Sequence, residues 1–533
     1  MASNSDGNKA ENQDQKGAQI TPEQAQLFNQ LIEYLRNQAQ GQQLNENEIN
    51  QKLQQQQPIQ IQQSEREKVF KQINDDLKIK VSGSQQQQKD IIEKQERACV
   101  IFVEMLKFNE EDDEGRMYAI KSGIVDSLLQ ILTKRDLNSI TVPFCSAFYC
   151  LTIFCSKWIR NQILIKKPYP ALIRLLSHGD AEVLRNAITS IHNLITEGIE
   201  DTEEDDPHQH FDEIQKCNGV AKIYEIFTKN ANKYTRDCCS VCIGYLFRAR
   251  EIKDSKMRLY IVQHLKLLTE DSEKQTRDGA LFAINHLSWN PVNLSEILKG
   301  DLLIQIRNSL RKELIGTSEE KKMIQTEQEH KCEVITAILE DREDDELRQN
   351  ILDIGIVDAL LFIIATREFN TITLPLLTAY LMMTDCCSNE FTIHCCRKNP
   401  FPALIRILDH PIDENIAGSA LTAIHNIIHH VYDSRSPDET HKYYEAVLVC
   451  DGISKMYKLF CTTQVKEIKD SASICIGRLF KSKKIDDEQM RKSIISHLKT
   501  LQNDPDENTQ MTAINALNLL SKNAANNAEI QKH

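Results

Sequence analysis

Two histidine–asparagine pairs lie near the ends of almost identical stretches of this sequence. AITSIHNLI, residues 187–195, contains His192 and Asn193, and ALTAIHNII, residues 420–428, contains His425 and Asn426. An asparagine amide offers one acceptor and two donors, so it can hold the main chain of an extended peptide without reading its side chains. The alternative is that the amides only cap a helix or bridge neighbouring repeats. We expect them to bind a peptide.

A cysteine-rich stretch could in principle bind zinc. TDCCSNEFTIHCC, residues 384–396, gathers four cysteines and one histidine. Adjacent cysteines, however, do not form the C-x₂-C pattern that brings two thiolates to one metal. Cys395 and Cys396 correspond to Ile163 and Leu164, 232 residues earlier, and a position that also accepts Ile or Leu is typical of an apolar core. We expect buried thiols and no metal site.

The remaining candidates for chemistry are weaker. The acidic stretch 200–206, with His208 and His210 after it, lacks the spaced ligands and the glycine of a calcium loop, so we interpret it as a solvated insert. His208 recurs as His441, which leaves a metal role open. The sequence shows no Gly-rich phosphate loop, Walker motif, kinase motifs or assignable catalytic triad. We therefore expect no enzymatic activity and no cofactor.

The elements that must position the asparagines occur twice. SGIVDSLLQIL at 122–132 returns as IGIVDALLFII at 354–364, and CNGVAKIYEIF at 217–227 returns as CDGISKMYKLF at 450–460. The offset is 355 − 123 = 232 in the first pair and 450 − 217 = 233 in the second. Such a shared register over many segments indicates an internal duplication, and repeats of this kind predict a solenoid.

Each half contains smaller helical units. Segments such as TRDCCSVCIGYLFRA place apolar residues at i, i+3 and i+4, and no alternating strand pattern of useful length occurs. The spacing of equivalent positions falls around the 40–47 residues of HEAT and armadillo repeats. We therefore predict an all-α fold, an internally duplicated α-solenoid, with one half at 90–315 and the second at 316–533.

The first 89 residues differ in composition. They are rich in Gln and Asn, with QQQQ at 54–57 and 85–88, and such a segment cannot bury enough apolar surface to offset chain entropy. We expect residues 1–89 to be mostly disordered. One exception is a short amphipathic helix over 22–38, in which Leu27, Phe28, Leu31, Ile32 and Leu35 share a face. This helix either stays solvated or docks on a partner or on the groove of this protein.

The pattern A-x-x-x-I-x-N-[LI] in the long helices resembles the third helix of armadillo repeats. The resemblance covers about 90–525 and indicates the armadillo/HEAT-like helical repeat superfamily rather than a particular member. It implies that third helices line a concave groove and that their asparagines hold an extended peptide. By position, the implied groove residues are His192, Asn193, His425 and Asn426, together with Asn285 and Asn518, which stand one residue early in their helices.

Charge and composition limit the class of partner. The net charge of −13 argues against nucleic acid and favours basic protein or peptide partners. The polar N-terminus lacks the apolar core of a secretory signal, and no apolar run reaches the roughly 18 residues of a membrane span. We expect a cytoplasmic protein without a membrane partner, with the nucleus as the alternative, and the oligomeric state stays open.

These features together predict a non-enzymatic scaffold that binds proteins or extended peptides along a groove. One alternative resembles importin alpha, a nuclear transport adaptor. That family has Trp four residues before the groove asparagine, whereas this chain has Thr189 and Thr422 there, and its basic N-terminal segment is missing here. A second alternative is a regulatory subunit that uses the Cys/His stretch as a metal site.

Overall fold

The computed structural model of the chain describes residues 63–107, 112–196, 206–229, 232–410, 413–430 and 441–532. Within these ranges the regular elements are helices and no β-strand occurs, which confirms the all-α prediction. The chain divides into two compact units, of which the first ends at Arg248 and the second begins at Ala249. The helix expected over 22–38 and residues 200–205 of the acidic insert lie outside the described residues. The division at 315/316 remains a prediction from the repeat.

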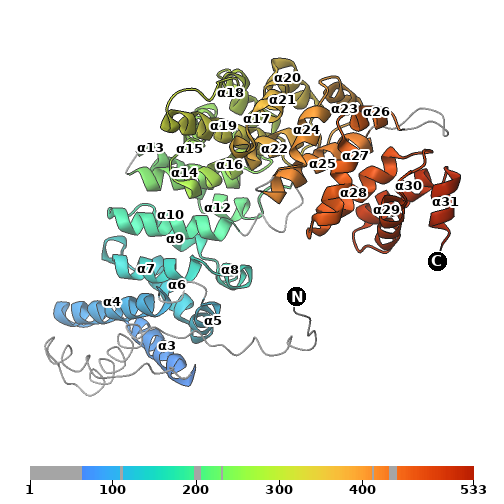
Figure 1. Cartoon of the computed structure of the whole chain (residues 1–533). Coiled ribbons are helices and arrows are strands. Elements are labelled where there is room, and N and C mark those ends of the chain that lie inside the picture. The colour runs from blue at the N-terminus through green and yellow to red at the C-terminus, as the bar shows by residue number, and fades with distance from the viewer. Residues whose placement is uncertain are drawn as a thin grey trace. The chain divides into compact units, whose positions relative to one another are not determined.

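In the first unit the long third helices α4, α7, α10 and α14 pack in that order, each on the next (Figure 1). The second helices α3, α6, α9 and α13 pack on the third helices of the same repeats. The helices are α3 (Gln63–Leu77), α4 (Gln85–Lys107), α5 (Asp113–Ser122), α6 (Ile124–Lys134), α7 (Val142–Thr152), α8 (Lys157–Leu164), α9 (Tyr169–Leu175), α10 (Ala181–Ile195), α12 (Phe211–Lys216), α13 (Gly219–Lys229) and α14 (Lys233–Leu246), with a 3₁₀ turn η1 at Leu137–Ser139.

The second unit continues the same order of elements. Here α16, α19, α22, α25, α28 and α30 pack successively, each on the next. The helices are α15 (Ser255–Leu268), α16 (Lys274–Ser288), α17 (Pro291–Leu298), α18 (Leu302–Leu310), α19 (Ser318–Leu339), α20 (Asp345–Ile354), α21 (Ile356–Thr366), α22 (Leu374–Leu381), α23 (Asn389–Cys396), α24 (Phe401–Ile407), α25 (Glu414–His430), α26 (Tyr444–Val449), α27 (Gly452–Thr462), α28 (Lys466–Leu479), α29 (Glu488–Leu501), α30 (Glu507–Leu520) and α31 (Ala524–Ile530), with η2 at Phe369–Thr371.

The sharp corner between first and second helices depends on a glycine. Gly123 joins α5 to α6 and Gly355 joins α20 to α21, both at φ +89°, in the left-handed region that glycine adopts without a Cβ clash. The two N–H groups donate to carbonyls of the preceding helical turn, at Ala119 and Ile351 among others. The corner turns the apolar stripes of α6 and α21 into the core, where Leu128 and Leu360 are completely buried.

In two repeats a buried arginine ties the first helix, α5 or α20, to the end of the third helix of the same repeat. Arg116 and Arg348, 348 − 116 = 232 residues apart, are the largest fully buried side chains. Arg116 donates to the carbonyl of Ile153 at 2.7 Å, and Arg348 donates to that of Met382 at 3.1 Å. Ile153 and Met382 follow directly after α7 and α22, where helix carbonyls lack an intrahelical partner and a cation is favourable. These bonds fix the first helix of each of these two repeats against its third helix.

The helical array already includes α3, so its described part begins before the predicted boundary at residue 90. Phe70 of α3 is completely buried, and its ring lies 5.6 Å from that of Phe102 in α4. Gln95, buried in α4, donates to the carbonyls of Leu77 and Ile79 at 2.9 Å. Residues 63–89 are therefore part of the folded body, although their composition predicted disorder. Composition missed the helix because its few apolar residues all fall on one face.

Candidate functional site: a pocket on α16, α19 and α22

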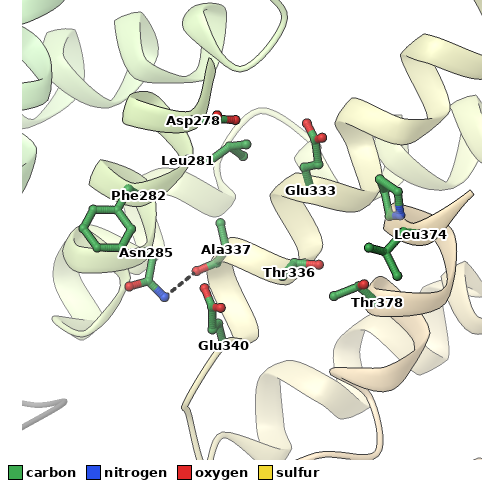
Figure 2. A pocket seen from close by; sticks show the side chains of 11 residues that line it. Asp278, Leu281, Phe282, Asn285, Glu333, Thr336, Ala337, Glu340, Leu374 and Thr378 are labelled. Atoms are coloured by element: carbon green, nitrogen blue, oxygen red, sulfur yellow. Dashed lines mark hydrogen bonds between the residues drawn. The ribbon is translucent and has the colours of Figure 1, made fainter. Parts of the chain in front are cut away.

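One pocket of the second unit lies across three successive third helices (Figure 2). It encloses about 310 Å³, and its walls combine apolar side chains with carboxylates. The lining comes from α16 (Asp278, Leu281, Phe282, Asn285), α19 (Glu333, Thr336, Ala337, Glu340) and α22 (Leu374, Pro375, Thr378).

The α16 wall follows from helical spacing. Asp278, Phe282 and Asn285 stand at i, i+4 and i+7, which places them on one stripe, while Ala280, Ala283, Ile284 and Leu287 fill the core on the other side. Phe282 keeps 41% of its surface exposed, and its ring lies 4.4 Å from that of His286 in the same helix. Asn285 is only 8% exposed and donates to the carbonyl of Ala337 in α19 at 3.1 Å, as the dashed line in Figure 2 shows.

The α19 wall provides a carboxylate in an apolar setting. Glu333 is half-buried, and its Oε2 atom is buried without a hydrogen-bond partner in the described part of the chain. Burial raises the pKa of this carboxyl, an effect that the charges of His330 and Arg277 oppose and that of Asp278 adds to. A desolvated carboxylate of this kind is stabilised by any cation that enters the pocket.

The α22 wall closes the pocket with apolar atoms. Pro375 stands in the first turn of α22, a position where its missing N–H has no cost. Leu374 beside it is 40% exposed, and Thr378 follows one turn later. Together the three helices form a pocket with an apolar lining and acidic groups, suited to a side chain that has an aliphatic stem and a positive end.

The predicted pair in the first unit is largely engaged within the protein. Both side chains are half-buried on α10. The His192 ring lies 5.6 Å from that of Tyr245 in α14, and burial lowers the pKa of His192. Asn193 donates from Nδ2 to Thr152 Oγ1 of α7 at 3.3 Å. Asn193 thus bridges neighbouring repeats, the alternative considered from the sequence, and its role in binding stays a prediction.

The other four predicted residues are spread over three helices of the second unit. Asn285 lines the pocket, whereas Asn518 of α30 is exposed and its carbonyl accepts from Ser521 Oγ at 2.8 Å. His425 and Asn426 of α25 are half-buried. The Asn426 Nδ2 atom is buried without a hydrogen-bond partner within the described ranges. Of the predicted residues, the structure therefore brings Asn285 alone into this pocket.

The cysteine-rich stretch is buried only in part: Cys387 and Cys395 are buried, Cys396 is half-buried, and Cys386 is exposed, where the sequence had predicted a buried thiol. Cys395 is completely buried, as is its counterpart Ile163, and burial raises the pKa of the Cys395 thiol. Cys387 Sγ lies 3.3 Å from Thr392 Oγ1. Among the described residues the cysteines are free, and no group of three or more His, Cys, Asp or Glu side chains is arranged to hold a metal ion.

The recurring histidines hold a turn in place. His208 is buried, and its Nε2 atom lies 2.9 Å from the carbonyl oxygen of Ile195. Its Nδ1 atom accepts from the N–H of His210, as His441 Nδ1 accepts from the N–H of Tyr443. Burial lowers the pKa of His208 to about 4, so this ring is neutral at physiological pH. Their recurrence is explained by this shared backbone contact.

No single helix within the described ranges is long and apolar enough to cross a membrane. The helices α20 and α21 meet the length and composition criteria only as a pair, with a 64° bend between them.

The residues that sequence reasoning missed are Asp278, Phe282 and Glu333. Their counterparts at the 233-residue offset are Met511, Asn515 and Val100, so the pocket is not duplicated. A search for repeated residues therefore could not find it. A search for differences between the two halves could have found these residues. Each one places a charge or an aromatic ring on a helical stripe where the corresponding helix of the other half has neither.

Comparisons with known proteins support the fold alone. No family model matches this chain, and no curated protein sequence matches it. An engineered protein whose crystal structure was determined by the Northeast Structural Genomics Consortium aligns with 84% of this chain and 98% of its own, at 16% identity and a TM-score of 0.51. A designed armadillo repeat protein aligns with 49% of this chain and 99% of its own, at 16% identity and a TM-score of 0.34, a likeness too low to add to the argument.

At such identity the first similarity shows an all-helical repeat fold and nothing about activity. The three-helix units, such as α5–α6–α7 and α12–α13–α14, have the organisation that the armadillo-like resemblance implied. The predicted all-helical repeat fold is confirmed, and the armadillo-like superfamily stays a resemblance.

Proposed function

We propose that this protein is a non-enzymatic scaffold that binds an extended, basic segment of a partner protein across the third helices α16, α19 and α22. The observation that carries the proposal is Glu333, a half-buried carboxylate whose buried Oε2 atom has no hydrogen-bond partner among the described residues, in a pocket that Phe282 and Leu374 also line. A protein that keeps such a group without an internal partner gains stability when a ligand supplies the cation.

The shape of the pocket supports a lysine or arginine of the partner. Its aliphatic stem would pack on the exposed parts of Phe282 and Leu374, and its charged end would meet Glu333. The ring of Phe282 adds a cation–π contribution of about 0.5–1 kcal/mol at an exposed site. Asp278 at the rim and the net charge of −13 favour the approach of a basic segment over that of an acidic one.

The test uses the full chain and short fluorescent peptides in which a central Lys or Arg is flanked by leucines. In matched peptides the central residue is norleucine, which keeps the stem without the charge. We expect the Lys peptide to bind roughly tenfold more tightly than the norleucine peptide, as measured by fluorescence anisotropy, with a preference that falls at high salt.

The variant Glu333→Gln should remove most of this preference, because it keeps the size of the side chain and deletes the charge. Glu319→Gln is the matched control, since Glu319 is an exposed residue in the first turn of the same helix. If both variants prefer the Lys peptide over the norleucine peptide as strongly as the natural chain does, this pocket does not recognise the cation and the proposal is wrong.

A further inference from the structure

The internal duplication makes α4 the counterpart of α19. At the start of α4 the Ser84 N–H donates to Gln87 Oε1 at 2.8 Å, and at the start of α19 the Thr317 N–H donates to Glu320 Oε2 at 2.7 Å. The two sites are 317 − 84 = 233 residues apart. Helix α4 packs on α3 and α7, and α19 packs on their counterparts α18 and α22. In addition, α19 packs on α16.

The helices α30 and α31 are in the same way the counterparts of α16 and α17. Asn526 of α31 donates to a carbonyl in the loop before α29 at 2.8 Å, as Asn293 of α17 donates to one in the loop before α15 at 2.7 Å. The face that α19 covers on α16 is open on α30 in the described part of the chain. Asn285 of α16 is 8% exposed, and its counterpart Asn518 is exposed.

The positions that face each other in α16 and α19 are acidic, whereas their counterparts are apolar. Asp278 and Glu333 line one pocket, and the charge of Asp278 helps to raise the pKa of Glu333. The counterparts are Met511 of α30, 65% exposed, and Val100 of α4, 48% exposed. Ile514, close to Met511 on α30, is 38% exposed. The outer face of a solenoid repeat needs polar residues for solubility, so exposed apolar residues at matched positions indicate two surfaces that meet.

We propose that the α30 face of one molecule of this protein packs on the α4 face of a second molecule, as α16 packs on α19 within the chain. In this contact Met511 and Ile514 of one molecule bury against Val100 of the other, and Asn518 takes the place of Asn285. The occupant of the α30 face is a second molecule because its α4 is the counterpart of α19, the helix that covers the same face of α16.

The contact joins two different faces, so it is heterologous. Each molecule has one face of each kind, and association therefore continues beyond two molecules unless a ring closes. A contact centred on one pair of helices buries a small area, so we expect weak assembly that depends on protein concentration. The inference is independent of the binding function proposed for the pocket on α16, α19 and α22.

Sedimentation velocity of the full chain over a wide range of concentrations tests the contact. We expect the average mass to rise with concentration. Met511→Asp and Val100→Asp should each weaken association by roughly tenfold or more, because each places a carboxylate in the buried centre of the contact. Val449→Asp is the matched control, since Val449 of α26 is 85% exposed and lies on neither face. This control should associate as the natural chain does.

A mixture of the two variants tests whether the two faces bind each other. The Met511→Asp molecule keeps its α4 face and the Val100→Asp molecule keeps its α30 face. The equimolar mixture should therefore form a complex of two molecules that does not grow, although each variant alone remains a single molecule. The recovery in the mixture also shows that both variants are folded.

Four results overturn the proposal. The first is a natural chain that remains a single molecule at every concentration, as expected if another segment of the same chain covers either face. The second is a mixture of the two variants that does not associate. The third is association of Met511→Asp or Val100→Asp alone that is as strong as that of the natural chain. The fourth is an equal loss of association in Val449→Asp.

Discussion

The helices α16 and α30 occupy sister positions in the duplication but present different surfaces. Their core positions correspond closely: Ala280, Ala283, Ile284 and Leu287 in α16 match Ala513, Ala516, Leu517 and Leu520 in α30. On the other side, Asp278 and Phe282 of α16 stand where α30 has Met511 and Asn515. The core is thus kept within the duplication while the surface stripe has diverged.

The neighbours of the two helices differ as well. The helix α16 packs on α19, which continues the array, whereas α30 packs on α28, α29 and the short α31. The same asparagine therefore has two environments, with Asn285 buried at 8% exposure and Asn518 exposed. A repeated residue in a solenoid thus takes its role from its contacts with the next repeat. Candidate binding residues are therefore better sought at positions where the two copies differ.

The largest expected effect concerns the shared core. Leu287→Ala should lower the free energy of unfolding by about 2–5 kcal/mol, because it leaves a cavity between packed helices. Leu520→Ala should cost less, since the last unit has fewer neighbours and relaxes more easily into the space. Urea unfolding followed by circular dichroism measures both. An equal or larger loss for Leu520→Ala would contradict the view that α30 is the looser copy.

The next prediction compares the stability contributions of Asn285 in α16 and Asn518 in α30. Asn285→Ala should cost about 1–3 kcal/mol, because it leaves the buried carbonyl of Ala337 without its donor. Asn518→Ala should stay within about 0.5 kcal/mol, as expected for an exposed side chain. Thermal unfolding of the two variants under identical conditions gives the comparison. Equal melting temperatures would show that the bond from Asn285 contributes nothing.

The sequence predicted the helical class and the duplication because both depend on apolar periodicity, which local residues determine. It also identified the helices that bear Asn193, Asn285 and Asn426. It did not predict that Asn193 reaches Thr152 or that Asn285 reaches Ala337, since those partners lie 41 and 52 residues away. Such contacts depend on how repeats stack, and no single repeat encodes them.

The pocket was unpredictable for a related reason. Its three walls come from α16, α19 and α22, and each wall taken alone is an ordinary surface stripe with a carboxylate or an apolar side chain. Glu333 looks like a solvated helix residue in the sequence, and only its partial burial in the folded structure makes it a desolvated carboxylate. The α30 copy lacks both the acidic and the aromatic group on its stripe, so it offered no second example from which to recognise the pattern.

The smallest expected effect concerns Glu333. Most substitutions lower the free energy of unfolding, whereas Glu333→Gln should raise it. Because burial raises the pKa of this carboxyl, the folded state holds the proton more tightly than the unfolded chain does. The resulting stability is present below the ordinary pKa of glutamate and is lost as the pH rises through the folded value. At neutral pH, Glu333→Gln should therefore stabilise the free protein, by less than about 1 kcal/mol. The gain should shrink as the pH falls below the ordinary glutamate value, and Glu319→Gln is the control for removing one exposed carboxylate from the same helix. Melting temperatures of the three proteins between acidic and neutral pH decide the matter. If Glu333→Gln instead destabilises the protein at neutral pH, the Glu333 carboxylate has a stabilising partner within the chain. Glu333 would then no longer support a cation site in this pocket.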